Sequence, residues 1–379
     1  MIYINGRFLG QRVTGVQRFA REALFALDGL LESESARAPG PFIVVAPRGV
    51  ERVKLRCIPV RHVGPLSGHA WEQLTLPASI GTSPLLSFGP TGPIGKRNQI
   101  VTIHDAAVRV VPESYGVAFR SLYSVMLPIL VRRAWRVATV SDFSRRELIG
   151  HFGAPDEKVI VVGEGCEHMV RMSAEPAVLE KNGLTPGRYF LAVSSLTANK
   201  NLGVVARAFQ ALRLSGVHLA LAGSVDERLF AEVSRPEGPA VRRLGYVTDG
   251  ELRALYENAA AFIFPSFYEG FGLPPIEAMA MGCPVIASNA AAIPEVCGDA
   301  PLYFDPRDEA ALANLMRRVV EDEGERRAMI HRGRETIRRH GWRATAKAYL
   351  ALARHWTERR CPSDKGRDGT GPDSLNTFT

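Results

Sequence analysis

The sequence predicts an α/β protein built from two doubly wound domains. Short apolar runs suited to buried parallel strands alternate with helical segments through most of the chain. At 379 residues the chain is too long for a single ordinary core and suits two. A mixed polar stretch over 163–186 interrupts the alternation, which then restarts. We therefore expect a first domain over 1–165, a linker over 166–186, a second domain over 187–341 and a final helix over 342–359.

The elements of the first half follow from its apolar runs and the residues that bound them. Strands are expected over 1–5, 42–46, 99–103 and 136–140, and helices over 15–31 and 115–137. The second helix contains Pro128, so it is either one long helix or two helices broken at the proline. The segment Ser141-Asp142-Phe143-Ser144 is expected to cap a further helix that carries Arg145 and Arg146.

The second half repeats the alternation of strands and helices. Strands are expected over 189–194, 217–222, 241–246, 261–264 and 284–288. Helices are expected to end at 212 and to span 308–321, 325–339 and 342–356. Residues 360–379 are polar and rich in Gly, Ser and Asp, which predicts a disordered tail.

The most informative stretch runs from Phe262 to Ser288. A buried strand gives way at Pro265 to a glycine-containing loop, and a short helix is expected over Pro275–Met281, ended by Gly282. A loop that leads into a helix N-terminus offers free backbone N–H groups and a favourable dipole to a phosphate. Gly270 and Gly272 would let the backbone approach that phosphate closely.

Two carboxylates bracket this loop, Glu269 at its mouth and Glu277 in the helix, in an E-x(7)-E spacing. Placed on either side of a phosphate-binding turn, they could reach hydroxyls on opposite sides of a sugar nucleotide. Alternatively, they are a surface glutamate and an ordinary helix glutamate favoured by the dipole. His104 and Asp105 also follow a strand, where polar residues face the ligand crevice of an open α/β sheet.

Composition and charge narrow the functional class. Residues 1–150 carry 19 Lys and Arg against 10 Asp and Glu, whereas the remainder is almost neutral, so the first half is expected to meet something anionic. No nucleic-acid motif is recognised, so a membrane surface or a diphosphate-linked acceptor fits better. Five scattered cysteines without a CxxC pair argue against disulfides and zinc. With no signal peptide and no apolar run of about 20 residues, we expect a soluble, cytoplasmic protein.

The string EGFGLPPIEAMAMGCPVIAS resembles the donor-site signature of the retaining glycosyltransferases of family 4, which have the GT-B architecture. The resemblance implies two Rossmann-like domains facing a cleft, with a C-terminal helix returning to the first domain. It also implies a retaining transferase without a cofactor. The absence of a D-x-D motif favours the metal-independent route, and we expect no metal site.

The resemblance further implies roles for individual residues. Lys200 matches a diphosphate ligand of the family, whereas Asn199 stands where Arg is usual. The catalytic group comprises His104, Lys200 and Glu269. Donor binding is assigned to Gly15, Asn199, Lys200, Val247, Glu269, Gly270, Phe271, Gly272, Leu273 and Glu277. Arg18 and Asp105 are placed on the acceptor side.

Function follows from these assignments. Trp71-Glu72-Gln73 to Leu76-Pro77 resembles a WEQ-x-x-LP segment of mannosyl- and rhamnosyltransferases of the family. We expect transfer of a hexose from a nucleotide-diphosphate sugar, GDP-mannose or nearly as readily a UDP-sugar, to a lipid-linked oligosaccharide in bacterial surface polysaccharide synthesis. Arg132, Arg133 and Arg136 either cap a helix or form a basic face for an anionic inner membrane.

Three alternatives stay open at this point. The first is a GT-B nucleotide-sugar epimerase or a phosphorylase. The second is a non-catalytic protein that binds a sugar nucleotide. The third is an NAD-dependent oxidoreductase, which is disfavoured because no G-x-G-x-x-G follows the first strand.

Overall fold

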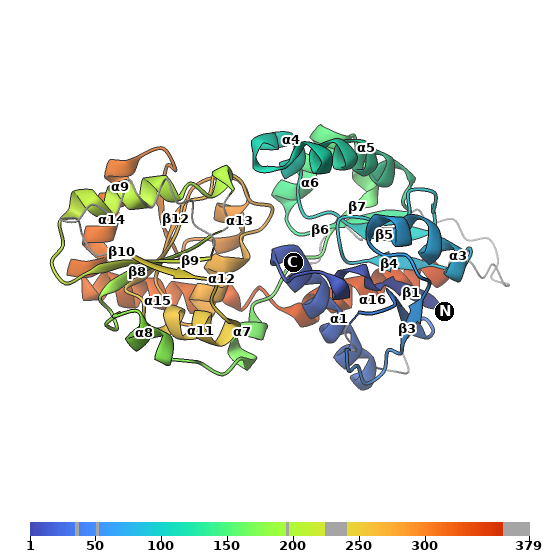
Figure 1. Cartoon of the computed structure of the whole chain (residues 1–379), viewed down its shortest axis with the longest axis horizontal. Coiled ribbons are helices and arrows are strands. Elements are labelled where there is room, and N and C mark those ends of the chain that lie inside the picture. The colour runs from blue at the N-terminus through green and yellow to red at the C-terminus, as the bar shows by residue number, and fades with distance from the viewer. Residues whose placement is uncertain (35–37, 51–52, 195–196, 224–240, 359–379) are drawn as a thin grey trace, which may run out of the picture. The chain divides into compact units, whose positions relative to one another are not determined.

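The computed structural model describes residues 1–34, 38–50, 53–194, 197–223 and 241–358 (Figure 1). The chain forms two compact units. Unit 1 comprises 1–106, 118–164 and the segment from 341 onward, and unit 2 comprises 107–117 and 165–340. The expected disordered tail at 360–379 lies outside the described residues, as does residue 359 of the expected final helix.

Unit 1 is built on a seven-stranded, fully parallel sheet in the order β3-β2-β1-β4-β5-β6-β7. Its strands are β1 (Ile2–Asn5), β2 (Phe42–Pro47), β3 (Val60–Val63), β4 (Leu85–Ser87), β5 (Gln99–Thr102), β6 (Arg136–Thr139) and β7 (Val159–Val161). The strand order reverses between β1 and β4. In an open α/β sheet, a reversal of this kind leaves a crevice at the carboxyl ends of the two strands.

The remaining elements of this part of the chain lie between its strands, except the C-terminal helix, and the two short ones over 107–114 belong to unit 2. They are η1 (Gly6–Gly10), α1 (Gly15–Ser33), α2 (Gly68–Ala70), η3 (Trp71–Thr75), α3 (Leu76–Ile80), α4 (Ala107–Val110), η4 (Pro112–Ser114), α5 (Val117–Arg133), α6 (Asp142–Phe152), η5 (Asp156–Lys158) and α16 (Trp342–Glu358). Helices α1 and α16 pack side by side (Figure 1). Tyr349 of α16 fixes this helix to the sheet, because its hydroxyl lies 2.6 Å from Thr102 Oγ1 and its ring meets Phe88 edge-on.

Unit 2 contains a six-stranded parallel sheet in the order β10-β9-β8-β11-β12-β13. Its strands are β8 (Tyr189–Ser194), β9 (His218–Gly223), β10 (Val241–Gly245), β11 (Ala261–Phe264), β12 (Val285–Ser288) and β13 (Leu302–Phe304). Here the order reverses between β8 and β11. The two units are therefore both doubly wound, which confirms the predicted fold class.

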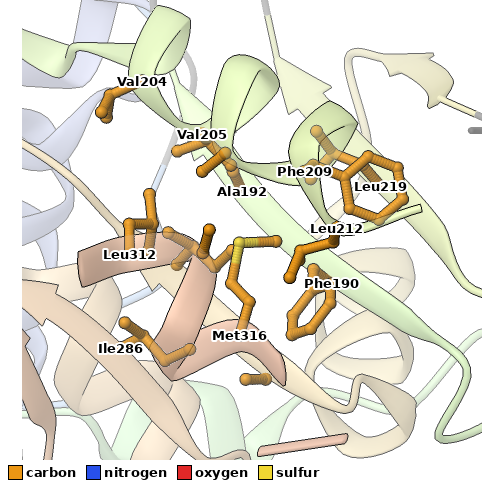
Figure 2. Close-up of a cluster of buried hydrophobic side chains, with 14 of the residues drawn as sticks. Phe190, Ala192, Val204, Val205, Phe209, Leu212, Leu219, Ile286, Leu312 and Met316 are labelled. Atoms are coloured by element: carbon orange, nitrogen blue, oxygen red, sulfur yellow. The ribbon is translucent and has the colours of Figure 1, made fainter. Parts of the chain in front are cut away.

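The other elements of unit 2 cover its sheet. They are α7 (Glu167–Arg171), α8 (Ala177–Lys181), η6 (Ala198–Lys200), α9 (Leu202–Leu212), α11 (Asp249–Asn258), α12 (Leu273–Ala280), α13 (Ile293–Cys297), α14 (Glu309–Glu321) and α15 (Glu323–Ile337). Figure 2 shows α9 and α14 packing over strand residues such as Phe190, Leu219 and Ile286 to form a buried hydrophobic core. Burial of these side chains stabilises each by about 1.5–3 kcal/mol relative to exposure.

The structure corrects several expected boundaries. The stretch 166–186 is not a connector, because it forms α7 and α8, which pack on α12 and α11 within unit 2. Residues 107–117 likewise belong to unit 2 rather than to the first domain. The expected helix over 115–137 is the unbroken α5, which contains Pro128 and ends at Arg133.

Strands β3, β4, β7 and β13, of three or four residues each, were not predicted. Runs this short give little periodic signal. The loop and helix that directly follow β11 were predicted more accurately, although the helix begins earlier than expected. Helix α12 begins at Leu273, two residues before the expected Pro275. Gly282 follows its last turn with a φ of +71°, as expected of a glycine that ends a helix.

Candidate functional site

The candidate site lies at the carboxyl ends of β8 and β11, where the strand order of unit 2 reverses. The chain leaves β8 toward η6 and α9, and it leaves β11 through the loop 265–272 toward α12. Because parallel strands point the same way, these two connections meet at one edge of the sheet. This position is where open α/β sheets bind their ligands.

The loop after β11 turns into α12 through Gly272, whose φ of +102° and ψ of 57° disfavour any residue with a Cβ. The first turn of α12 contains Pro274 and Pro275, which have no N–H and therefore lose no hydrogen bond there. Among the described residues, none provides an acceptor for the amide N–H of Phe271, Gly272 or Leu273. These amides and the helix dipole suit an anion at this end of the helix.

Lys200 and Glu269 come together beside this turn although they are 69 residues apart. Lys200 Nζ lies 2.5 Å from Glu269 Oε1, and the two side chains are only 24% and 16% exposed to solvent. The ammonium also lies 5.8 Å from the ring centroid of Phe264, the last residue of β11. The pair thus holds one positive and one negative group beside the amino end of α12.

Two asparagines beside Lys200 fasten its loop to the loop after β11. Asn199 Nδ2 donates to the carbonyl of Tyr268 at 3.1 Å, and the Asn199 carbonyl accepts from the Phe267 amide at 2.8 Å. Asn201 has a left-handed backbone with a φ of +52°, and its side chain donates to the carbonyls of Pro265 and Pro306. Asn199 was expected to contact the donor. In the structure it joins the two loops by hydrogen bonds.

Glu277 lies in the middle of α12 and is almost fully buried. Its Oε1 is 2.8 Å from Nε2 of His168, a completely buried residue of α7. Burial, and then the negative charge of Glu277, raise the pKa of the Tyr256 hydroxyl well above its usual value. The Glu277 carboxylate is thus held by the buried His168 and is not free on the surface. Sequence reasoning missed His168, because no local pattern relates it to a residue 109 positions away.

The other expected donor residues of unit 2 occupy different places. Phe271 is buried, and its ring meets His340 edge-on at 5.6 Å. The His340 ring is held by the carbonyl of Val296 at 2.9 Å from Nε2, and burial is the main reason that its pKa is lowered. Gly270 lies in the loop between Glu269 and α12. Val247 is half-buried in the turn between β10 and α11, a helix that begins with a capping box of Thr248 and Glu251.

Four expected site residues lie in unit 1. His104 follows β5 and packs edge-on against Phe19 at a centroid distance of 4.7 Å. Both of its ring nitrogens are buried and lack a hydrogen-bond partner among the described residues, and burial lowers the pKa of His104 to about 4. It is therefore a neutral imidazole. Asp105 is half-buried next to it, Gly15 is the first residue of α1, and Arg18 is half-buried in the same helix.

The described part of the chain contains no group of three or more His, Cys, Asp or Glu side chains that could hold a metal ion. Every helix in that part is too short or too polar to cross a lipid bilayer.

Comparison with known proteins gives consistent matches. The family described as glycosyl transferases group 1 matches residues 176–336, which contain Lys200, Glu269 and Glu277. The chain is 33% identical over 267 residues to O-antigen chain mannosyltransferase B of Escherichia coli, with 67% of this chain and 70% of that protein covered. It is 31% identical over 230 residues to O-antigen chain mannosyltransferase RfbU of Salmonella typhimurium, covering 59% and 62%.

Solved structures resemble the chain over almost its whole length. A glycosyltransferase from Rickettsia africae has a TM-score of 0.66 at 16% identity, covering 94% of this chain and 98% of that one. Sucrose-phosphate synthase from Thermosynechococcus elongatus has a TM-score of 0.71 at 18% identity, covering 94% and 99%. At these identities the similarity shows the shared fold.

Proposed function

Because the chain belongs to the group 1 glycosyltransferases and has the GT-B fold, we propose that it is a retaining, metal-independent mannosyltransferase. The donor is a nucleotide-diphosphate sugar, with GDP-mannose first and a UDP-sugar second. The acceptor is a lipid-linked saccharide of a bacterial surface polysaccharide. The choice of mannose is supported by the names of the two similar O-antigen enzymes and by the WEQ segment. We place this reaction in the cytoplasm.

The observation that carries the proposal is the Lys200–Glu269 pair beside the amino end of α12. Transfer of a sugar requires stabilisation of the negative charge that develops on the departing diphosphate. The Lys200 ammonium and the amides of Phe271, Gly272 and Leu273 are preorganised groups of the required sign. When the donor binds, Glu269 exchanges its contact with Lys200 for hydroxyls of the donor sugar, which leaves the ammonium for the diphosphate.

Glu277 serves the ribose of the nucleotide in this proposal. A carboxylate can accept hydrogen bonds from two neighbouring hydroxyls, provided that it is held at a fixed angle. The contact of 2.8 Å between His168 and Glu277 supplies that orientation and keeps a buried negative charge hydrogen-bonded. His168 is therefore a positioning residue, because it acts through Glu277.

A panel of nucleotide sugars tests the donor assignment. A matched donor stabilises the folded protein by mass action, by about 2.7 kcal/mol at a concentration one hundred times its Kd. We expect GDP-mannose to raise Tm more than UDP-glucose, UDP-galactose or NAD. Release of the nucleoside diphosphate with a mannosylated acceptor, followed by NMR of the product's anomeric centre, then checks transfer and retention. A protein that no nucleotide sugar stabilises would not be the proposed enzyme.

We also propose that α5 brings the protein to an anionic membrane surface. Its Phe119, Leu122 and Val125 are 41%, 44% and 64% exposed, and Arg132 and Arg133 are exposed at its end. Exposed apolar and basic side chains on one helix favour an anionic bilayer. Arg136, expected to join them, instead stacks on the Trp135 ring at 4.9 Å.

Sedimentation with phosphatidylglycerol vesicles tests this membrane contact. We expect binding at low salt that weakens as salt rises and in the variant R132Q/R133Q, whereas R327Q, at an exposed arginine of α15, leaves it unchanged. Absence of binding at low salt disproves the membrane contact and leaves the transferase assignment untouched.

A further inference from the structure

The loop after β13 lies at the same edge of the sheet as the Lys200–Glu269 pair. Strand β13 ends at Phe304, and in the parallel sheet its carboxyl end follows those of β11 and β12. The residues after it, 305–308, lead into α14. No residue of this loop is among the site residues expected from the sequence.

Asn201 fixes this loop to the candidate site. Its Nδ2 donates to the carbonyl of Pro306 at 2.7 Å and to the carbonyl of Pro265 at 3.3 Å. Pro265 is the first residue after β11, whereas Pro306 follows β13. Because β12 separates these two strands in the sheet, their loops meet across the end of β12. The side chain directly after Lys200 therefore holds both loops.

Arg307 packs on the loop that leads into α12. Its Cζ lies over the Phe267 ring, 5.5 Å from the centroid, and a cation in this position is attracted by the ring electrons. The Phe267 amide donates to the carbonyl of Asn199 at 2.8 Å. The backbone of Arg307 is fixed as well, since its amide donates to Asp305 Oδ1 at 2.8 Å. The guanidinium is thus held against the loop that is joined to Asn199.

The guanidinium of Arg307 is exposed and has no hydrogen bond or ion pair with any residue that the structure describes. The acidic side chains nearest to it in sequence have other partners. Asp305 accepts the amide of Arg307, and Asp308 accepts an amide of α14. Glu309 forms an ion pair with Arg207 at 2.7 Å. A guanidinium that stacks through its flat face keeps the N–H groups at its edge available, so Arg307 can bind an anion with them.

The charge of the candidate site leaves a need for such a cation. Lys200 and Glu269 form an ion pair at 2.5 Å, so together they contribute no net charge. Asn199 stands where related transferases usually have an arginine, and its Nδ2 already donates to the carbonyl of Tyr268. The diphosphate of a nucleotide sugar, in contrast, carries a negative charge on each phosphate. One lysine that is shared with a glutamate balances only part of that charge.

We propose that the Arg307 guanidinium binds the diphosphate of the nucleotide sugar and supplies the positive charge that Asn199 does not provide. The planar fork of an arginine can donate two parallel hydrogen bonds to phosphate oxygens. Phe267 is a positioning residue, because it fixes the plane of that fork. This inference rests on the proposed transferase function and adds to it a donor-binding residue from the loop after β13.

Calorimetric titration of the full chain with GDP tests this assignment without turnover. UDP is titrated in parallel, because both nucleotides belong to the proposed donors. R307Q removes the charge, R307K keeps it without the planar fork, and R307Q/N199R places an arginine at the usual position of the family. R317Q is the matched control, since Arg317 is exposed on α14 and also has no hydrogen bond or ion pair among the described residues. Thermal unfolding checks that each variant is folded.

We expect R307Q to weaken binding of the preferred nucleotide about tenfold and to raise donor KM by a similar factor, as for loss of a hydrogen bond between charged groups. The Kd of R307Q should also depend less on salt than that of the wild type, because one screened attraction is gone. R307K should retain part of the affinity, and R307Q/N199R should recover most of it. R317Q should match the wild type within about twofold.

Three results overturn the assignment. The first is an equal nucleotide Kd in the wild type and folded R307Q, even with a lowered Tm, which would make the contact with Phe267 purely structural. The second is an equal loss in R307Q and R317Q, which would indicate a general effect of surface charge. The third is R307Q/N199R binding no tighter than R307Q, because Arg307 would then not replace the charge missing at Asn199. Failure of the proposed function looks different, since the wild type would then bind neither nucleotide and turn over no nucleotide sugar.

Discussion

Replacing Lys200 with methionine tests the stabilisation of the departing diphosphate. Methionine keeps the apolar stem beside the Phe264 ring and removes the charge. Lys200 and Glu269 are 24% and 16% exposed, so the effective dielectric constant is nearer 20 than that of water. At that value a unit charge about 4 Å from a diphosphate oxygen contributes about 4 kcal/mol.

Loss of one preorganised group that stabilises developing charge typically lowers kcat by about 10²–10³-fold, or about 2.7–4 kcal/mol. We expect K200M to fall in this range, and K200R to recover part of the loss because it restores the charge. Because Glu269 keeps some access to water, the free energy of unfolding should fall by only about 1 kcal/mol. A continuous assay of nucleoside diphosphate release and a thermal unfolding curve measure the two effects.

The matched control is R207M. Arg207 lies on α9, the helix that follows Lys200, and its Nε forms an ion pair with Glu309 at 2.7 Å. Both partners are exposed, so this pair contributes about 0–1 kcal/mol and the variant should retain full activity. If folded K200M turns over saturating donor within threefold of the wild-type rate, the charge of Lys200 does not stabilise the leaving group and the reasoning is wrong.

Three further variants test other parts of the structure. H168A leaves Glu277 buried without its partner, so urea denaturation should show a loss of about 3–5 kcal/mol, and H168Q a smaller loss with a raised donor KM. The pKa of His104 is about 4 in the folded protein against 6.5 in the unfolded chain. The contribution of His104 to the free energy of unfolding is therefore fully present above pH 6.5, and roughly 3 kcal/mol is lost as the pH falls from 6.5 to 4. H104L should reduce the slope of unfolding free energy over that window; an unchanged slope contradicts a buried neutral imidazole. In G272A the added Cβ meets no atom closer than 3.7 Å, so any destabilisation comes from the φ of +102° alone. We expect the free energy of unfolding to fall by about 1–3 kcal/mol, and an unchanged Tm would contradict backbone strain at this position.

Local sequence determined much of the fold around the candidate site. The strand at 261–264 was predicted with its observed bounds, because a short apolar run ended by Pro265 has few other conformations. Gly282 after α12 was predicted correctly, and the segment 141–144 predicted to cap a helix contains Ser141, the N-cap of α6, since caps depend on neighbouring residues only. The helix start at Leu273 was missed because it depends on the unusual backbone of Gly272.

Tertiary structure alone decided which side chains meet. Strands β8 and β11 lie side by side although two strands of the same sheet separate them in sequence, and this crossover places Lys200 2.5 Å from Glu269. The same reason applies to the contacts of Glu277 with His168 and of Glu72 with Arg7, 109 and 65 residues apart. Periodicity and capping record local backbone preferences, whereas the partner of a buried charge depends on strand order, which no local pattern contains.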